Sequence, residues 1–283
     1  MPDHASTNPQ KFVDLGRPRR IWALASLHAQ LDHLHAMHEV IGSRFQPGDR
    51  LIYLGNLIGR GPRVVETVDA LLDFRRALLS MRGMLAEDIV YLRGGQEEMW
   101  QKLLQLHFAP NPREVLEWML RQGVEATLAA YGGVAEQGMA AARGGTMALS
   151  RWTQALRAAV QAHPGHEKLF SSLKRAAYTG NPAGNLAGGA SEAGGVLFVN
   201  AGIDPARPFG HQGDSFWWGG AAFSRIDAPY GGFRRVVRGY DPARGGARVE
   251  DFTATLDAGC GQGGPLVCGV LAASGEILEL FQV

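Results

Sequence analysis

Five polar segments of the sequence, each placed after an apolar run, carry side chains that could do chemistry. They contain Ser26 and His28, Asn56 and Arg60, Arg93 and Gln96, Asn200, and Tyr240. A histidine can bind a metal or transfer a proton. An arginine can hold a phosphate or a carboxylate through two parallel hydrogen bonds. The segments therefore indicate a polar site in which Arg60 and Arg93 either contact an anion or are held by a neighbouring acid or carbonyl group.

The elements that position these segments follow an alternating pattern. Apolar runs at 20–27, 49–58 and 88–95 are typical of buried strands, and amphipathic stretches at 29–42 and 63–79 are typical of helices. Further short strands are expected at 195–205, 234–242, 252–260, 265–273 and 275–283. This alternation favours an α/β architecture with parallel pairing, in which ligands bind at the carboxyl ends of strands. We therefore expect the five segments to meet at one place.

The remaining stretches define the domain organisation. Residues 1–18 are expected to form a flexible leader, and residues 19–283 a single domain. Within that domain, residues from about 97 to 178 indicate a helical cap, and the Gly- and Ala-rich residues 180–195 indicate a surface loop.

Composition limits the classes of function. Hydrophobic residues make up 46% and charged residues 19% of the 283 residues, which is enough apolar material for a substantial core. The net charge of +1 provides no attraction to nucleic acid or to an acidic membrane. Two cysteines, Cys260 and Cys268, are too few for a disulfide framework or a metal quartet. We expect a cytoplasmic protein with no membrane or nucleic-acid partner.

The five segments, read in order, resemble the motifs of a known superfamily. They stand as ASLHA, GNLIGRG, GGQE, NAG and GYD. The calcineurin-like metallophosphoesterases carry GD-x-HG, GD-x-x-DRG, GNHE, HAG and GH-[TS] in the same order, and the bacterial serine/threonine phosphatases and diadenosine tetraphosphatases are the most similar members. The resemblance covers about residues 20–283. It implies a four-layer αββα sandwich of two mixed β-sheets with a helical cap insertion.

The resemblance also shows where this chain departs from the superfamily. Members bind two divalent metals such as Mn, Fe or Zn, and their ligand positions fall here on Ser26, His28, Asn56, Gly95, Asn200 and Tyr240. The pair that handles the leaving-group proton falls on Gly59 and Gln96. Only His28 is a strong ligand among these residues, and no carboxylate remains to bridge two cations. We therefore expect a degenerate site with no metal cofactor and no catalytic residues.

The leading hypothesis is a pseudophosphatase that acts by binding, as a scaffold for a protein partner or as a regulator that senses a phosphorylated ligand. The alternative is an active phosphoesterase, a phosphoric ester hydrolase whose metal site has been rebuilt from the cap or from the run of Asp32, His33, His35 and His38. A third hypothesis is a nucleotide or phosphopeptide binder that uses Arg60 and Arg93 without hydrolysis. Trp217 and Trp218 are expected to pack or to form an aromatic wall.

Overall fold

The structure, a computed structural model, describes residues 11–180 and 194–283. The first ten residues of the predicted leader, and all but the ends of the predicted loop at 180–195, lie outside the described residues.

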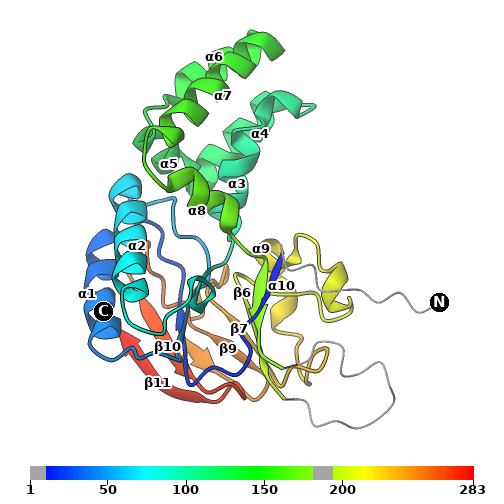
Figure 1. Cartoon of the computed structure of the whole chain (residues 1–283). Coiled ribbons are helices and arrows are strands. Elements are labelled where there is room, and N and C mark those ends of the chain that lie inside the picture. Colours follow the sequence, from blue (N-terminus) through cyan, green and yellow to red (C-terminus); the bar gives the residue numbers. More distant parts are fainter. Residues whose placement is uncertain (1–10, 181–193) are drawn as a thin grey trace, which may run out of the picture.

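Two mixed β-sheets form the centre of the protein (Figure 1). The five-stranded sheet has the order β11 (Ile277–Gln282), β10 (Val267–Leu271), β2 (Ile21–Leu24), β3 (Arg50–Tyr53), β4 (Ile89–Tyr91). The six-stranded sheet has the order β1 (Phe12–Asp14), β5 (Ala176–Tyr178), β6 (Val196–Val199), β7 (Arg235–Arg238), β9 (Thr253–Thr255), β8 (Arg248–Val249). Strands β2, β3 and β4 pair in parallel, as do β6, β7 and β9, so their carboxyl ends lie at the same edge of each sheet.

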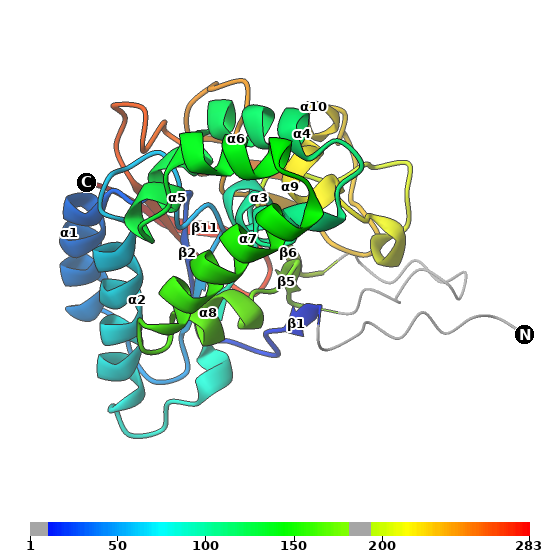
Figure 2. The same cartoon turned by 90° about the horizontal axis from the view of Figure 1, so that it is seen from above.

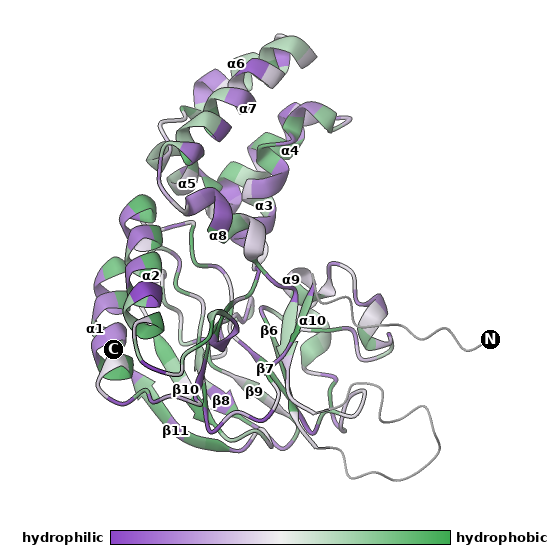
Figure 3. Ribbon diagram, viewed as in Figure 1, coloured by the Kyte–Doolittle hydropathy of each residue, from purple (hydrophilic) through white to green (hydrophobic). Residues whose placement is uncertain are grey.

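Helices cover the outer faces of both sheets and complete four layers. Helices α1 (Leu31–Gly42) and α2 (Val64–Leu79) pack on the five-stranded sheet through a core that contains Leu34 and Leu71. Between the sheets lies a second core, and α9 (Ser215–Trp218) and α10 (Gly220–Phe223) contribute to a third core on the six-stranded sheet. Strand β11 is largely hydrophobic, whereas the short edge strand β8 is hydrophilic (Figure 3). The expected αββα sandwich of two mixed sheets is therefore confirmed.

A group of helices rises above the sandwich and forms the cap (Figures 1 and 2). Its elements are α3 (Gly95–Leu103), η2 (Leu106–Phe108), α4 (Pro112–Met119), η3 (Leu120–Val124), α5 (Glu125–Ala130), α6 (Ala135–Arg143), α7 (Thr146–Gln161) and α8 (His166–Ser172). Two further short 3-10 turns, η1 (Ala86–Asp88) and η4 (Phe209–His211), lie in the sandwich. None of the helices in the described ranges is both long and apolar enough to cross a membrane.

Three details of the predicted organisation were wrong. Part of the predicted flexible leader, Phe12–Asp14, forms strand β1 and pairs in parallel with β5. The last residues of the predicted cap, Ala176–Tyr178, are β5 itself, because this apolar triplet pairs with β1 and β6 instead of extending α8. The short edge strand β8 was not predicted. Three-residue strands such as β1 and β5 are too short to show a periodicity in sequence, and only their pairing defines them.

Candidate functional site

The loops that follow five strands meet at one edge of the sandwich and are joined by hydrogen bonds. Ser26 N–H donates to Gly239 O at 2.9 Å, His28 N–H donates to Asn56 O at 2.7 Å, and Tyr240 N–H donates to Asn200 O at 2.8 Å. The side chain of Asn200 donates through Nδ2 to Leu54 O at 2.7 Å. The motif segments therefore form one cluster, which is called the loop cluster below.

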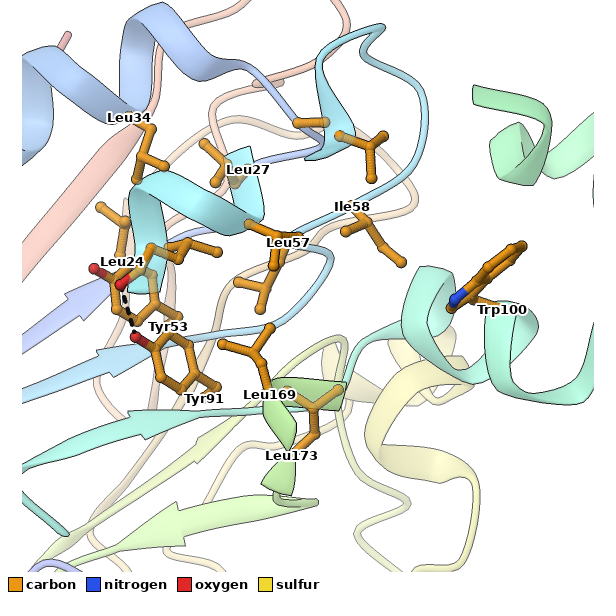
Figure 4. Packing of buried hydrophobic residues seen from close by; sticks show 14 of the residues in the cluster. Leu24, Leu27, Leu34, Tyr53, Leu57, Ile58, Tyr91, Trp100, Leu169 and Leu173 are labelled. Carbon is orange, nitrogen blue, oxygen red and sulfur yellow. Dashed lines mark hydrogen bonds between the residues drawn. The ribbon is translucent and has the colours of Figure 1, made fainter. Parts of the chain in front are cut away.

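The second loop owes its position to two apolar residues. Leu57 and Ile58 are fully buried, and they lie with Leu27 in the core beneath the loop cluster (Figure 4). Because this pair turns inward, the flanking Asn56 and Arg60 take up left-handed backbone angles, with φ of 51° and 62°. His28 does the same, with φ of 50°. Such conformations are uncommon for residues other than glycine and persist only where the surrounding structure imposes them.

The carboxylate of Glu97 holds two of the loops together. Its Oε2 accepts hydrogen bonds from the backbone N–H groups of Asn56 at 2.9 Å and Gly94 at 2.8 Å. Its Oε1 accepts from Leu57 at 2.6 Å and Ile58 at 3.2 Å. Burial raises the pKa of Glu97, and these four donors act against that rise. Glu97, which the sequence reasoning did not single out beyond its place in the third segment, is therefore the structural centre of the loop cluster.

A tryptophan occupies the space beside Gly95, the position that matches a metal ligand of the superfamily. A Cβ atom built on Gly95 would lie 2.9 Å from Cζ3 of Trp218. The Trp218 ring is 45% exposed and packs edge-on against Trp118 of helix α4, with the ring centroids 5.9 Å apart. Its neighbour Trp217 is buried in the third core. Of the two roles expected for these tryptophans, Trp217 therefore takes the packing role in the core, and Trp218 forms an aromatic wall that covers Gly95.

Gly59 and Gln96 are the positions that match the proton-handling pair of the superfamily. Here the Gln96 side chain packs directly against Gly59. A Cβ atom on Gly59 would lie only 2.1 Å from Oε1 of Gln96. The Gln96 side chain is held in place because its Nε2 donates to Gln122 O at 2.8 Å in the cap. Gly59 also has a φ of 83°, which favours glycine. The space of a side chain at position 59 is therefore filled by Gln96.

We expect Gly59→Ala to lower the free energy of unfolding by about 3 kcal/mol, because it combines left-handed backbone strain with overpacking against Gln96. In a Gln96→Ala background the overpacking term disappears, and the penalty should fall to about 1–2 kcal/mol. Urea unfolding of the two single variants, the double variant and the parent chain measures the coupling. Equal penalties in both backgrounds would show that the two positions do not interact.

His28, the one strong metal ligand retained, is buried and uncharged. Burial, with a further contribution from the positive charge of Arg60, lowers its pKa to about 3. Both ring nitrogens are buried without a hydrogen-bond partner in the described residues, and the ring packs edge-on against Tyr240. At neutral pH His28 is therefore a neutral imidazole and provides no positive charge to the loop cluster.

The residues present do not fit a two-metal centre. Asn56 uses both of its amide atoms, since Nδ2 donates to Ser26 Oγ at 3.2 Å and Oδ1 accepts from Gln96 N–H at 3.0 Å. Gly95 has no donor atom, and Trp218 lies where a side chain would extend. Within residues 11–180 and 194–283, no three His, Cys, Asp or Glu side chains are grouped so that they could hold a metal ion. The loop cluster lacks the anionic bridge that two close divalent cations require.

The two candidate arginines differ in their surroundings. Arg93 pairs with Glu98 at 3.0 Å, so a neighbouring carboxylate already compensates its charge. Arg60 is half-buried, and in the described part of the chain its side chain forms no ion pair or hydrogen bond. Its backbone N–H donates to Gly123 O at 3.1 Å, which fixes the loop against the cap. Arg60 is therefore the better candidate for contact with an anion.

The histidine run on α1 lies apart from the loop cluster. His35 and His38 line a surface hollow of about 480 Å³ between α1 and α2. His38 is buried, bonds to the Tyr53 hydroxyl at 2.8 Å and stacks on Phe74. It follows Leu34 by one helical turn and so shares the buried face of α1.

Sequence reasoning missed the buried carboxylate that anchors the fifth loop. Asp241 forms an ion pair with Arg238 at 2.9 Å and accepts a hydrogen bond from Arg248 at 3.0 Å, and its own N–H donates to Asp257 at 2.8 Å. Asp241 was visible in the sequence as the residue after Tyr240. Arg238 lies three residues before Asp241, but its burial and the contacts with Arg248 and Asp257 depend on how the fifth loop packs, which no spacing rule shows.

Comparison with solved structures identifies proteins with a similar fold. The chain is 17% identical to a candidate diadenosine tetraphosphatase, with a TM-score of 0.51, over 96% of this chain and 97% of that one. It is 14% identical to a serine/threonine protein phosphatase from Saccharomyces cerevisiae, with a TM-score of 0.51 over 96% and 84% of the two chains. A cold-active protein-tyrosine phosphatase from a psychrophilic Shewanella gives 12% identity and the same TM-score over 97% and 85%. The chain has the calcineurin-like metallophosphoesterase fold.

The metallophosphoesterase fold thus extends over nearly the whole chain, cap included. No protein-family model matches this sequence. No curated protein matches it at a significant level. At these identities the likeness concerns the fold, so the function must be argued from the loop cluster itself.

Proposed function

We propose that this protein is a pseudophosphatase that binds a phosphorylated ligand at the loop cluster without hydrolysing it. The observation that carries the proposal is Arg60, a half-buried cation with no acidic partner in the described ranges, placed among loops that lack a carboxylate bridge. A partly buried guanidinium without a counter-ion favours an anionic ligand, and its planar donors match the oxygens of a phosphate.

The surroundings of Arg60 support binding in preference to turnover. Gln96 cannot donate a proton to a leaving group near neutral pH, and His28 is neutral and buried. The Glu97 carboxylate in the loop cluster is taken up by four backbone N–H groups, so Arg60 and neutral polar groups remain for a ligand. Such groups can hold a phosphate ester but cannot generate a metal-bound nucleophile.

We expect phenyl phosphate to bind the purified protein, and Arg60→Gln to weaken this binding at least about tenfold, as the loss of a charge-assisted contact implies. Arg82→Gln, at an exposed position away from the loop cluster, removes the same charge and should leave the affinity unchanged. Isothermal titration calorimetry of the three proteins measures the effect. Absence of binding, or equal loss in both variants, contradicts the proposal.

The same samples test the lack of hydrolysis. After incubation with phenyl phosphate and Mn²⁺, we expect no phosphate release above the buffer rate and no stoichiometric Mn, Fe or Zn in the protein. Metal-dependent release that disappears in Ser26→Ala or Asn56→Ala would instead establish an active phosphoesterase with a rebuilt site.

A further inference from the structure

Strand β11 is an open edge of the five-stranded sheet. In the described residues it pairs only with β10, as the last strand of its sheet. Leu266 N–H donates to Val283 O at 2.9 Å and Val283 N–H donates to Leu266 O at 3.1 Å, which sets the alternation along the pair. The backbone groups of Glu279 and Phe281 therefore point to β10, and those of Leu280 and Gln282 point outward, while Leu278 lies at a bulge in the pair.

This edge has little of the protection that exposed strands usually carry: its one charged residue, Glu279, is paired with Arg44, and a bulge affects only its first residues. Its sequence, ILELFQ, contains no proline and no lysine. It is six residues long, and Leu278 and Leu280 are 46% and 43% exposed. A largely apolar edge with outward-pointing backbone donors and acceptors is a template for pairing with another strand.

We propose that the protein forms a two-fold symmetric dimer in which β11 pairs antiparallel with β11 of a second copy, centred on Leu280. In the dimer, residues whose backbone groups point outward must pair with residues of the same kind in the partner. This condition places the two-fold axis on a residue and not between two residues. The central candidates are residues 279, 280 and 281. An axis at Glu279 would oppose two carboxylates, which is unfavourable. An axis at Phe281 would pair fewer strand residues. The axis at Leu280 places Leu280 against the partner's Leu280 and gives the longer overlap.

Charge complementarity favours the same register. On one face of the strand, Arg44 pairs with Glu279 at 3.2 Å and lies over the Phe281 ring at 4.8 Å. With the axis at Leu280, Phe281 faces the partner's Glu279. The partner's carboxylate then lies beside Arg44, so that each Arg44 contacts an acid from both copies. This inference is independent of the proposed ligand site, because β11 lies in the sheet and carries none of the loop-cluster residues.

A cysteine on the axis tests the register. In a hydrogen-bonded antiparallel pair the Cα atoms are about 5.5 Å apart, within the range of a disulfide. We expect Leu280→Cys to form a covalent dimer as its main species under mild oxidation. Val249→Cys, equally exposed on the edge strand β8, should stay monomeric. The native Cys260 and Cys268 are buried and do not compete. Cross-linking of both variants to the same extent, or of neither, overturns the proposal.

Sedimentation equilibrium of the full chain tests whether the protein dimerises and whether the charges of Arg44 and Glu279 contribute to the affinity of the dimer. We expect a concentration-dependent dimer that Leu280→Lys weakens at least about tenfold, because like charges would then oppose each other on the axis. Arg44→Glu should weaken it, and Arg44→Glu combined with Glu279→Arg should restore it. Circular dichroism confirms that each variant is folded. A monomer mass at all concentrations up to about 1 mM, or a dimer insensitive to these changes, overturns the proposal.

Discussion

Glu97→Ala is expected to lower the free energy of unfolding by more than about 4 kcal/mol, because it leaves four buried backbone N–H groups without an acceptor, at about 1–3 kcal/mol each. These donors belong to Asn56, Leu57, Ile58 and Gly94, which lie in two different loops. The loss is a large fraction of the stability of an ordinary domain. Chemical denaturation followed by circular dichroism measures it.

A milder variant and a control separate this effect from a general loss of packing. Glu97→Gln keeps one oxygen for two of the donors and turns an amide N–H₂ toward the other two, so we expect about half of the penalty. Lys102→Ala, an exposed position on the same helix, should change stability by less than about 0.5 kcal/mol. If Glu97→Ala were as stable as Lys102→Ala, the carboxylate would not hold the loops. Because the two loops carry Asn56 and Arg60, both Glu97 variants should also weaken phenyl phosphate binding.

Asp241→Asn is the second variant with a large expected effect, a loss of about 3–5 kcal/mol, because it leaves Arg238 buried without its counter-ion. The side chains of Asp241 and Arg238 are 1% and 3% exposed, so water cannot replace the lost charge. Asp73→Asn, which breaks an exposed ion pair with Arg76, provides the control and should cost less than about 1 kcal/mol. Similar losses for the two variants would contradict the buried-pair assignment.

The carboxylate of Asp241 also determines the direction in which the stability of the protein changes with pH. Burial acts to raise the pKa of Asp241, but the hydrogen bond from Arg248, the backbone donors and the charge of Arg238 outweigh it and lower the pKa below its ordinary value of 3.8. A group whose pKa is lowered by folding stabilises the protein above its ordinary pKa and loses that contribution as the pH falls through the folded value. We therefore expect the stability difference between the parent chain and Asp241→Asn to shrink progressively below about pH 4. A difference that stays constant down to pH 2 would contradict this.

The sequence by itself determined the architecture and the composition of the loop cluster. The ordered segments around Ser26, Asn56, Gly95, Asn200 and Tyr240 resemble the metallophosphoesterase motifs, and that resemblance implied the sandwich, while the apolar run before each segment indicated a buried strand. Alternation of strands and helices then places their carboxyl ends at one edge. Side-chain chemistry alone also shows that no carboxylate stands at the bridging position.

Only the tertiary structure decided which side chains fill the space beside Gly95 and Gly59, the positions where the superfamily carries functional side chains. Trp218 reaches Gly95 from a segment more than a hundred residues away, and Gln96 fills the space at Gly59 because the cap carbonyl of Gln122 fixes it. Arg60 and Arg93 look equivalent in sequence, yet within residues 11–180 and 194–283 Arg93 pairs with a carboxylate, Glu98, and Arg60 does not. The physical reason is the same in each case. Backbone pattern is set by local periodicity, whereas burial, charge compensation and steric filling depend on residues that meet only when distant segments pack together.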